Sequence, residues 1–186
     1  MNQALLIIDA QQELMDGNSD EKEVFQKDKL IANINSVIKQ ALAKGVHIIF
    51  VRDKDVADGR GAGFQVHNKI KIPTSPVTFI NKEATNSFYN TNLLPFLQWN
   101  QIEHLVIMGC KTEHCIDTAV RTATVNSFDV TLVGNGHSTT DSKTLSAEKI
   151  IAHHNELLDG HYNVDNFSVV RYSDENLFEP NHNQYR

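Results

Sequence analysis

The sequence contains few cysteines and no excess of positive charge. Its 186 residues include two cysteines, and 17 basic residues stand against 23 acidic ones, which gives a net charge of −6. The basic residues are scattered along the chain rather than gathered into a stripe that could pair with phosphates. We therefore expect no nucleic-acid partner.

A long hydrophobic run is also missing. The N-terminal stretch MNQALLIIDAQQE has a short apolar segment with no basic residues before it, and this segment is too short for a signal-peptide core or a bilayer span. We expect a cytoplasmic protein with no membrane partner. Thiols stay reduced in that compartment, so a disulfide between Cys110 and Cys115 is not expected.

The remaining composition is that of an ordinary globular protein. Hydrophobic residues make up 40% of the chain and charged residues 22%. A chain of this length can bury a sizeable core in one compact unit. We expect a single domain that spans residues 1–186.

Apolar runs of strand length alternate with helical patterns along the chain. Strands that are buried on both faces and alternate with helices favour a parallel sheet with helices on both sides. The sequence therefore predicts an α/β fold. Strands are expected at 4–9, 46–53, 104–109, 129–134 and 167–172, and helices at 30–45, 91–99, 115–127 and 146–158.

Two segments show little periodicity. The segment 53–80 contains two prolines and three glycines, and its length is typical of a functional loop or lid. The glycines do not lie in a strand-to-helix turn with phosphate-loop spacing, so no nucleotide cofactor is expected. The polar tail 173–186 is expected to wrap the surface or fray.

Candidate chemistry gathers at the ends of the predicted strands. In an open parallel sheet, ligands bind beyond the carboxyl ends of the strands, where the strand order reverses. Asp9, Asp53 and the stretches 109–115 and 134–141 leave such ends. In a doubly wound order, the first strand and the strand before 109–115 are neighbours across that point.

Both cysteines lie in the stretch GCKTEHC. Cys115 is expected at the start of a helix, where the peptide dipoles favour a thiolate. That help matters because a free thiol is only about 3% ionised at pH 7. The alternative is a small buried apolar residue, which suits Cys110 better because it continues the run LVIMGC. The five-residue spacing, without a second Cys/His pair, is not that of a zinc site, and we expect no metal.

Other polar candidates each have a structural alternative. Asp9 could cap a turn, and Lys82 could be a solvated surface charge. If both converge on Cys115, the carboxylate can take the thiol proton and the ammonium can stabilise both anions. His67 and His137, in presumed strand-end loops, could contact a substrate or serve the structure.

Three motifs carry a resemblance to a known family. ALLIIDAQQEL, INKEATNSFYNTNL and VIMGCKTEHCIDTAVRTA resemble, in this order, the motifs of the isochorismatase-like cysteine hydrolases. The resemblance implies a Rossmann-like three-layer α/β/α sandwich with a mostly parallel, doubly wound sheet. It also implies a triad of Asp9 as general base, Lys82 as electrostatic partner and Cys115 as nucleophile.

The resemblance implies further features of the site. A cis peptide bond is expected between Cys110 and Lys111, with the backbone amides of Lys111 and Cys115 as the oxyanion hole. The family's nicotinamidases carry a metal site with an Asp-x-His motif after the second strand. Here the matching stretch RDKDVADG has no histidine, so neither a metal nor nicotinamide is expected.

The stretch GAGFQVH is similar to the streptothricin-hydrolase-type branch of the family. Four residues are expected to contact the substrate: Asp53, Phe64, His67 and His114. We expect no cofactor. A homo-oligomer is expected because members of the family commonly assemble.

The sequence thus predicts a cysteine-dependent hydrolase of a small non-peptide amide, lactam or carbamoyl substrate, which acts through a thioester. One alternative is vinyl-ether hydrolysis of the isochorismatase type, with Asp9 as the acid and Cys115 as a bystander. Another is a catalytically silent member of the family with a binding role.

Overall fold

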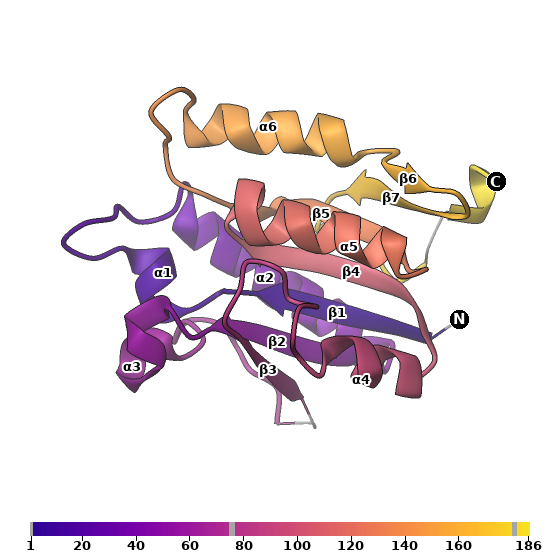
Figure 1. The fold of residues 1–186 in the computed structure, drawn as a ribbon, viewed down its shortest axis with the longest axis horizontal. Coiled ribbons are helices and arrows are strands. Elements are labelled where there is room, and N and C mark those ends of the chain that lie inside the picture. Colours follow the sequence, from indigo (N-terminus) through magenta and orange to yellow (C-terminus); the bar gives the residue numbers. More distant parts are fainter. Residues whose placement is uncertain (1, 75–76, 180–181) are drawn as a thin grey trace.

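A seven-stranded sheet forms the centre of the computed structural model, which describes residues 2–74, 77–179 and 182–186 (Figure 1). The strand order is β3-β2-β1-β4-β5-β7-β6, and every pair is parallel except β6 with β7. The order reverses between β1 and β4, so the predicted doubly wound sheet is confirmed. The strands are β1 (Asn2–Ile8), β2 (His47–Asp53), β3 (Thr78–Lys82), β4 (Ile102–Cys110), β5 (Asp129–Ser138), β6 (Tyr162–Asn163) and β7 (Asn166–Arg171).

Helices cover both faces of the sheet, which confirms the predicted three-layer sandwich. Figure 1 shows α4 and α5 in front of the sheet and α2 behind it. No described helix is long and apolar enough to cross a membrane. The helices are α1 (Gln12–Asp16), α2 (Lys27–Ala43), α3 (Gly61–Phe64), α4 (Leu93–Trp99), α5 (Asp117–Val125) and α6 (Ala147–Leu158).

β1 shows why the sequence forms a sheet with two covered faces. Successive side chains of a strand point to opposite faces, and both faces of β1 are buried. Leu5 and Ile7 pack in the core on the α2 side, whereas Leu6 and Ile8 pack with α4 and α5. The run is therefore continuously apolar rather than alternating.

Three segments differ from the sequence-based expectation. β5 continues to Ser138, four residues beyond the predicted end, so His137 lies inside the sheet. The segment 53–80 contains the short turn Val56–Gly59 and α3, while its residues 75–76 lie outside the described part. The tail does not fray over its described residues, because Leu177 and Phe178 are buried in the core on the α2 side.

The backbone makes its tightest approach at the point where the strand order reverses. Gly109 lies in β4 beside the end of β1, with a φ of +126°. A Cβ atom at this position would lie 1.9 Å from the carbonyl oxygen of Ile8. Only glycine allows β4 to pass β1 this closely, and this contact sets the spacing between the two strand ends.

We expect Gly109→Ala to lower the free energy of unfolding by about 4 kcal/mol, because backbone atoms must move to admit the methyl group. Gly45→Ala is the matched control, since Gly45 also has a positive φ of 66° but an added Cβ atom there would meet nothing within 4 Å. We expect the control to lose only about 1 kcal/mol. If urea unfolding shows that both variants lose the same free energy of unfolding, the close approach of β4 to β1 at Gly109 does not have the proposed role.

Candidate active site

The three residues of the predicted triad meet at the carboxyl end of the sheet. Asp9 directly follows β1, Lys82 is the last residue of β3, and Cys115 lies in the π-helical turn Thr112–Ile116 after β4. The Lys82 Nζ atom lies 2.9 Å from Asp9 Oδ2 and 3.4 Å from Cys115 Sγ. The topology therefore brings together side chains that are more than 100 residues apart in the sequence.

Asp53 is the fourth member of this cluster. It ends β2, and its carboxylate forms an ion pair with the ammonium of Lys82. The Lys82 and Asp9 side chains are fully buried, whereas the Asp53 side chain is 15% exposed. One buried ammonium thus faces two carboxylates and a thiol, so its positive charge only partly balances the cluster.

The negative charge of the Asp9 carboxylate is only partly balanced by its surroundings. Burial raises its pKa to about 6, against the opposing effect of the Lys82 ammonium. The ion pair with Lys82 does not align as a hydrogen bond, and neither carboxylate oxygen has a hydrogen-bond partner in the described part of the chain. Such a group is suited to accept a proton from a neighbour near neutral pH.

The thiol of Cys115 is less acidic than we expected from its place before a helix. Burial, together with the charge of Asp9, raises its pKa to about 12. The sulfur and the carboxylate oxygens of Asp9 and Asp53 all lie within 4.8 Å of one another. A thiolate therefore forms at neutral pH only if the proton moves to a neighbouring base.

Cys110 has a different environment. It is fully buried in the core on the α2 side, and burial raises the pKa of its thiol far above the usual value. It does not line the cavity described below, which fits the role of an apolar residue. The peptide bond that joins it to Lys111 is cis.

A buried hydrogen-bond chain fixes the turn that carries Cys115. Asn155 of α6 donates from Nδ2 to the Gly134 carbonyl over 2.9 Å, so its Oδ1 accepts from His137 Nε2 over 2.8 Å. His137 Nδ1 then accepts the Thr112 hydroxyl over 2.9 Å. His137 is buried and acts as a positioning residue, and Thr112 and Asn155 escaped the sequence analysis because their partners are distant in the chain.

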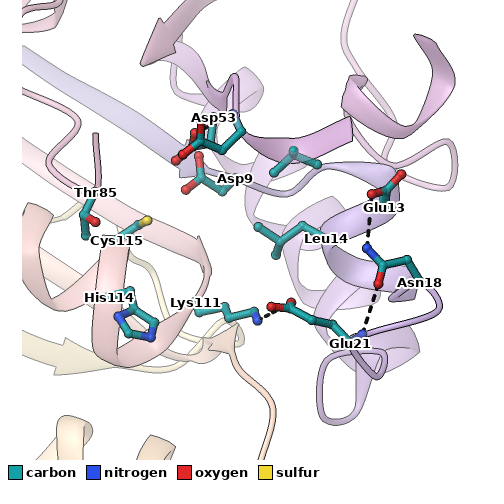
Figure 2. Close-up of a pocket in the computed structure, with 12 residues that line it drawn as sticks. Asp9, Glu13, Leu14, Asn18, Glu21, Asp53, Thr85, Lys111, His114 and Cys115 are labelled. Atoms are coloured by element: carbon teal, nitrogen blue, oxygen red, sulfur yellow. Dashed lines mark hydrogen bonds and ion pairs between the residues drawn. The ribbon is translucent and has the colours of Figure 1, made fainter. Parts of the chain in front are cut away.

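A cavity of about 460 Å³ opens in front of the cluster (Figure 2). This volume suits a small molecule. Five residues predicted for the site lie in its lining: Asp9, Asp53, Lys111, His114 and Cys115. The opposite wall comes from α1 and the loop after it, through Glu13, Leu14, Asn18 and Glu21, none of which the sequence analysis identified.

Two predicted substrate contacts do not lie in this lining. The Phe64 ring is buried under the Arg52 guanidinium, 4.6 Å away, and His67 Nε2 lies 3.1 Å from Asp16 Oδ1. The segment 53–80 folds back on α1, as the bond from the His67 amide to the Ala10 carbonyl shows. Both side chains therefore pack this segment in place outside the cavity lining, and their contact with a substrate stays a prediction.

The acidic members of the cluster could in principle hold a metal ion. Asp9, Asp53 and Cys115 form the one group of three potential ligands found among the described residues. The ammonium of Lys82 already lies between these atoms and supplies the positive charge. A divalent ion would have to displace a buried cation, so the donor set fits an ammonium better than a metal.

Comparison with known proteins places this geometry in a family. The model of the Isochorismatase domain matches residues 3–155. An uncharacterised isochorismatase family protein of Bacillus subtilis is 29% identical over 137 residues, which cover 71% of each chain. A protein of Arabidopsis thaliana described as a probable inactive nicotinamidase is 28% identical over 140 residues, or 64% of this chain and 71% of that one.

Solved structures agree with this relationship. A crystal structure of an isochorismatase family protein superposes with a TM-score of 0.81 at 27% identity, and covers 91% of this chain and 98% of its own. An isochorismatase of Pseudomonas putida gives a TM-score of 0.79 at 27% identity over 92% of this chain and 88% of its own. The family model matches most of the chain, and the chain belongs to the isochorismatase family.

Proposed function

We propose that this hydrolase cleaves a small non-peptide amide, lactam or carbamoyl compound through a thioester on Cys115. The observation that carries the proposal is the placement of the thiol. It lines the cavity with the Lys82 ammonium 3.4 Å away and the Asp9 carboxyl group in the same cluster. A thiol, a base and a cation in this arrangement are the parts that nucleophilic catalysis needs.

The first half of the reaction forms the thioester. Asp9 accepts the thiol proton while Lys82 stabilises the thiolate, and the sulfur attacks the carbonyl carbon. The backbone amides of Lys111 and Cys115 are the proposed donors to the oxyanion. When the oxyanion collapses, the C–N bond breaks and Asp9 gives its proton to the leaving nitrogen.

The second half hydrolyses the thioester. Asp9, again a carboxylate, takes a proton from a water molecule, whose oxygen attacks the thioester carbonyl. Collapse of this second oxyanion breaks the C–S bond and releases the carboxylic acid, or the carbamic acid for a carbamoyl substrate. The proton on Asp9 returns to the sulfur, which restores the resting state.

The two alternatives each have one supporting observation. The raised pKa of Asp9, about 6, lets this group hold a proton in mildly acidic solution, as an acid for ether hydrolysis would require. The relative described as a probable inactive nicotinamidase supports a silent member. Neither alternative needs the thiol of Cys115 to react.

We expect Cys115→Ala to abolish ammonia release in a screen of small amides, with a loss of at least about a thousandfold in kcat. Cys110→Ala is the matched control, because it removes the same atom five residues away and outside the cavity. We expect the control to keep its activity within about threefold once it is folded. Ammonia release that survives in Cys115→Ala would contradict a thioester on Cys115.

We expect the rate of Cys115 alkylation by iodoacetamide to be flat above about pH 6 and to fall about tenfold per unit below it. The reason is that the thiolate forms when the Cys115 proton moves to Asp9. This transfer does not change the total number of protons on Asp9 and Cys115, so the thiolate fraction does not depend on pH until Asp9 is protonated by the solvent. Mass spectrometry should find Cys110 almost unmodified, because it is fully buried.

Asp9→Asn is the control for this profile, since asparagine tolerates the positive φ of 50° at this position. Without the carboxylate, the plateau should disappear, and the rate should rise about tenfold per pH unit from pH 6 to pH 9, as for a simple thiol. A wild-type rate that rises in this way from pH 6 to pH 9 would sink the proposed role of Asp9.

A further inference from the structure

The cavity contains more negative charge than its own cations can balance. Lys111 is the one lysine or arginine in its described lining, and Lys82 adds a second cation behind Asp9 and Asp53. With histidine counted as neutral, five carboxylates and two ammonium groups leave a net charge of −3. The five carboxylates are those of Asp9, Glu13, Glu21, Asp53 and Asp55.

Two of these carboxylates have no cation of their own. Lys82 pairs with Asp9 and Asp53, and Lys111 Nζ lies 2.7 Å from Glu21 Oε2. Within the described ranges, neither Glu13 nor Asp55 makes an ion pair with a lysine, arginine or histidine. We call Glu13 and Asp55 the acidic rim.

Glu13 is held in a fixed place without being neutralised. Its Oε1 accepts a hydrogen bond from Asn18 Nδ2 over 3.2 Å. A Cβ atom on Gly63 would lie 2.8 Å from its Oε2, so the glycine leaves room for this carboxylate. Figure 2 shows Glu13 and Cys115 on opposite sides of the cavity, with Leu14 between them in this view.

The floor of the cavity carries a further carboxylate whose charge is only partly balanced. Asp9 is completely buried and lines the cavity, yet its Oδ1 has neither a hydrogen bond nor an ion pair among the residues that the structure describes. Asp9 therefore adds to the negative charge that Glu13 and Asp55 give to the lining. In the described part of the chain, no potential metal-binding group includes the acidic rim, so an organic cation suits it better than a metal ion.

We propose that the substrate carries a protonated amine or amidine at the end remote from the scissile amide, and that the acidic rim binds this group. The inference rests on the proposed function for the reaction and adds the substrate class. The carbonyl lies at Cys115, an aliphatic stretch crosses Leu14, and the cation reaches Glu13, while Asp55 adds negative charge beside Asp53. Substrates with a carboxylate at the same end are repelled by the net charge of the cavity.

The charge preference can be measured at Cys115 without knowledge of the substrate. The probes are two methanethiosulfonate reagents of similar size, one with a trimethylammonium group and one with a sulfonate. In both, the sulfur of Cys115 forms a mixed disulfide and methanesulfinate leaves. We measure the ratio of the cationic reagent's rate to the anionic reagent's rate at Cys115, and divide it by the same ratio measured with 2-mercaptoethanol. We expect this normalised ratio to be about 100. Cys115→Ala gives the background from Cys110.

The variants test whether the acidic rim is the cause. Glu13→Gln combined with Asp55→Asn should lower the normalised ratio at least about tenfold. Asp58→Asn with Glu23→Gln removes two exposed carboxylates outside the lining and should leave the ratio unchanged. A wild-type ratio near one, or an unchanged ratio in the rim variant, would overturn the inference.

Matched amides then separate this inference from the proposed function. We expect 5-aminopentanamide to release ammonia at least about tenfold faster than hexanamide, and adipamate to be slowest. Cys115-dependent release that is equal for the three amides, or fastest for adipamate, overturns the substrate class and leaves the hydrolase standing. No release from any amide, together with a high reagent ratio, counts against the amidohydrolase but supports a cavity that selects cations.

Discussion

The site depends on the ammonium of Lys82, which is buried between three other functional groups. It contacts carboxylates that end β1 and β2 and the sulfur on the turn after β4. Two buried carboxylates without this cation would repel each other at a high cost in free energy. Because one cation does not fully balance two anions, Asp9 keeps a raised pKa and stays available as a base. The same ion pairs therefore maintain the structure and prepare the chemistry.

The topology explains why these groups can meet. β1 and β4 are neighbours at the point where the strand order reverses, and Gly109 lets them pass at backbone contact. The carboxyl ends of β1, β2, β3 and β4 then open on one edge of the sheet, as expected for a ligand site of this fold class. The turn with Cys115 is fixed from the other side by the buried chain through His137 and Asn155.

The sequence allowed good predictions where local pattern decides the structure. Continuous apolar runs predicted the buried strands, and polar residues at their ends predicted the position of Asp9. The wall formed by Glu13 and Glu21 could not be predicted, because it depends on how the loop after α1 lies against Lys111. The packing of Phe64 and His67 outside the cavity lining could not be predicted for a similar reason, since it depends on how the segment 53–80 lies against distant residues. The environment of the Cys115 thiol could not be predicted either, because its burial and its closeness to the charge of Asp9, which raise its pKa, arise only from the fold.

The central claim is that Asp9 is a buried carboxylate whose charge Lys82 compensates only in part. A carbon-13 NMR titration of the Asp9 side-chain carboxyl, assigned by its loss in Asp9→Asn, tests this directly. The account predicts a midpoint of about 6. A midpoint at or below the ordinary aspartate value of 3.8 would show that Lys82 neutralises the group completely, and would contradict the proposed base.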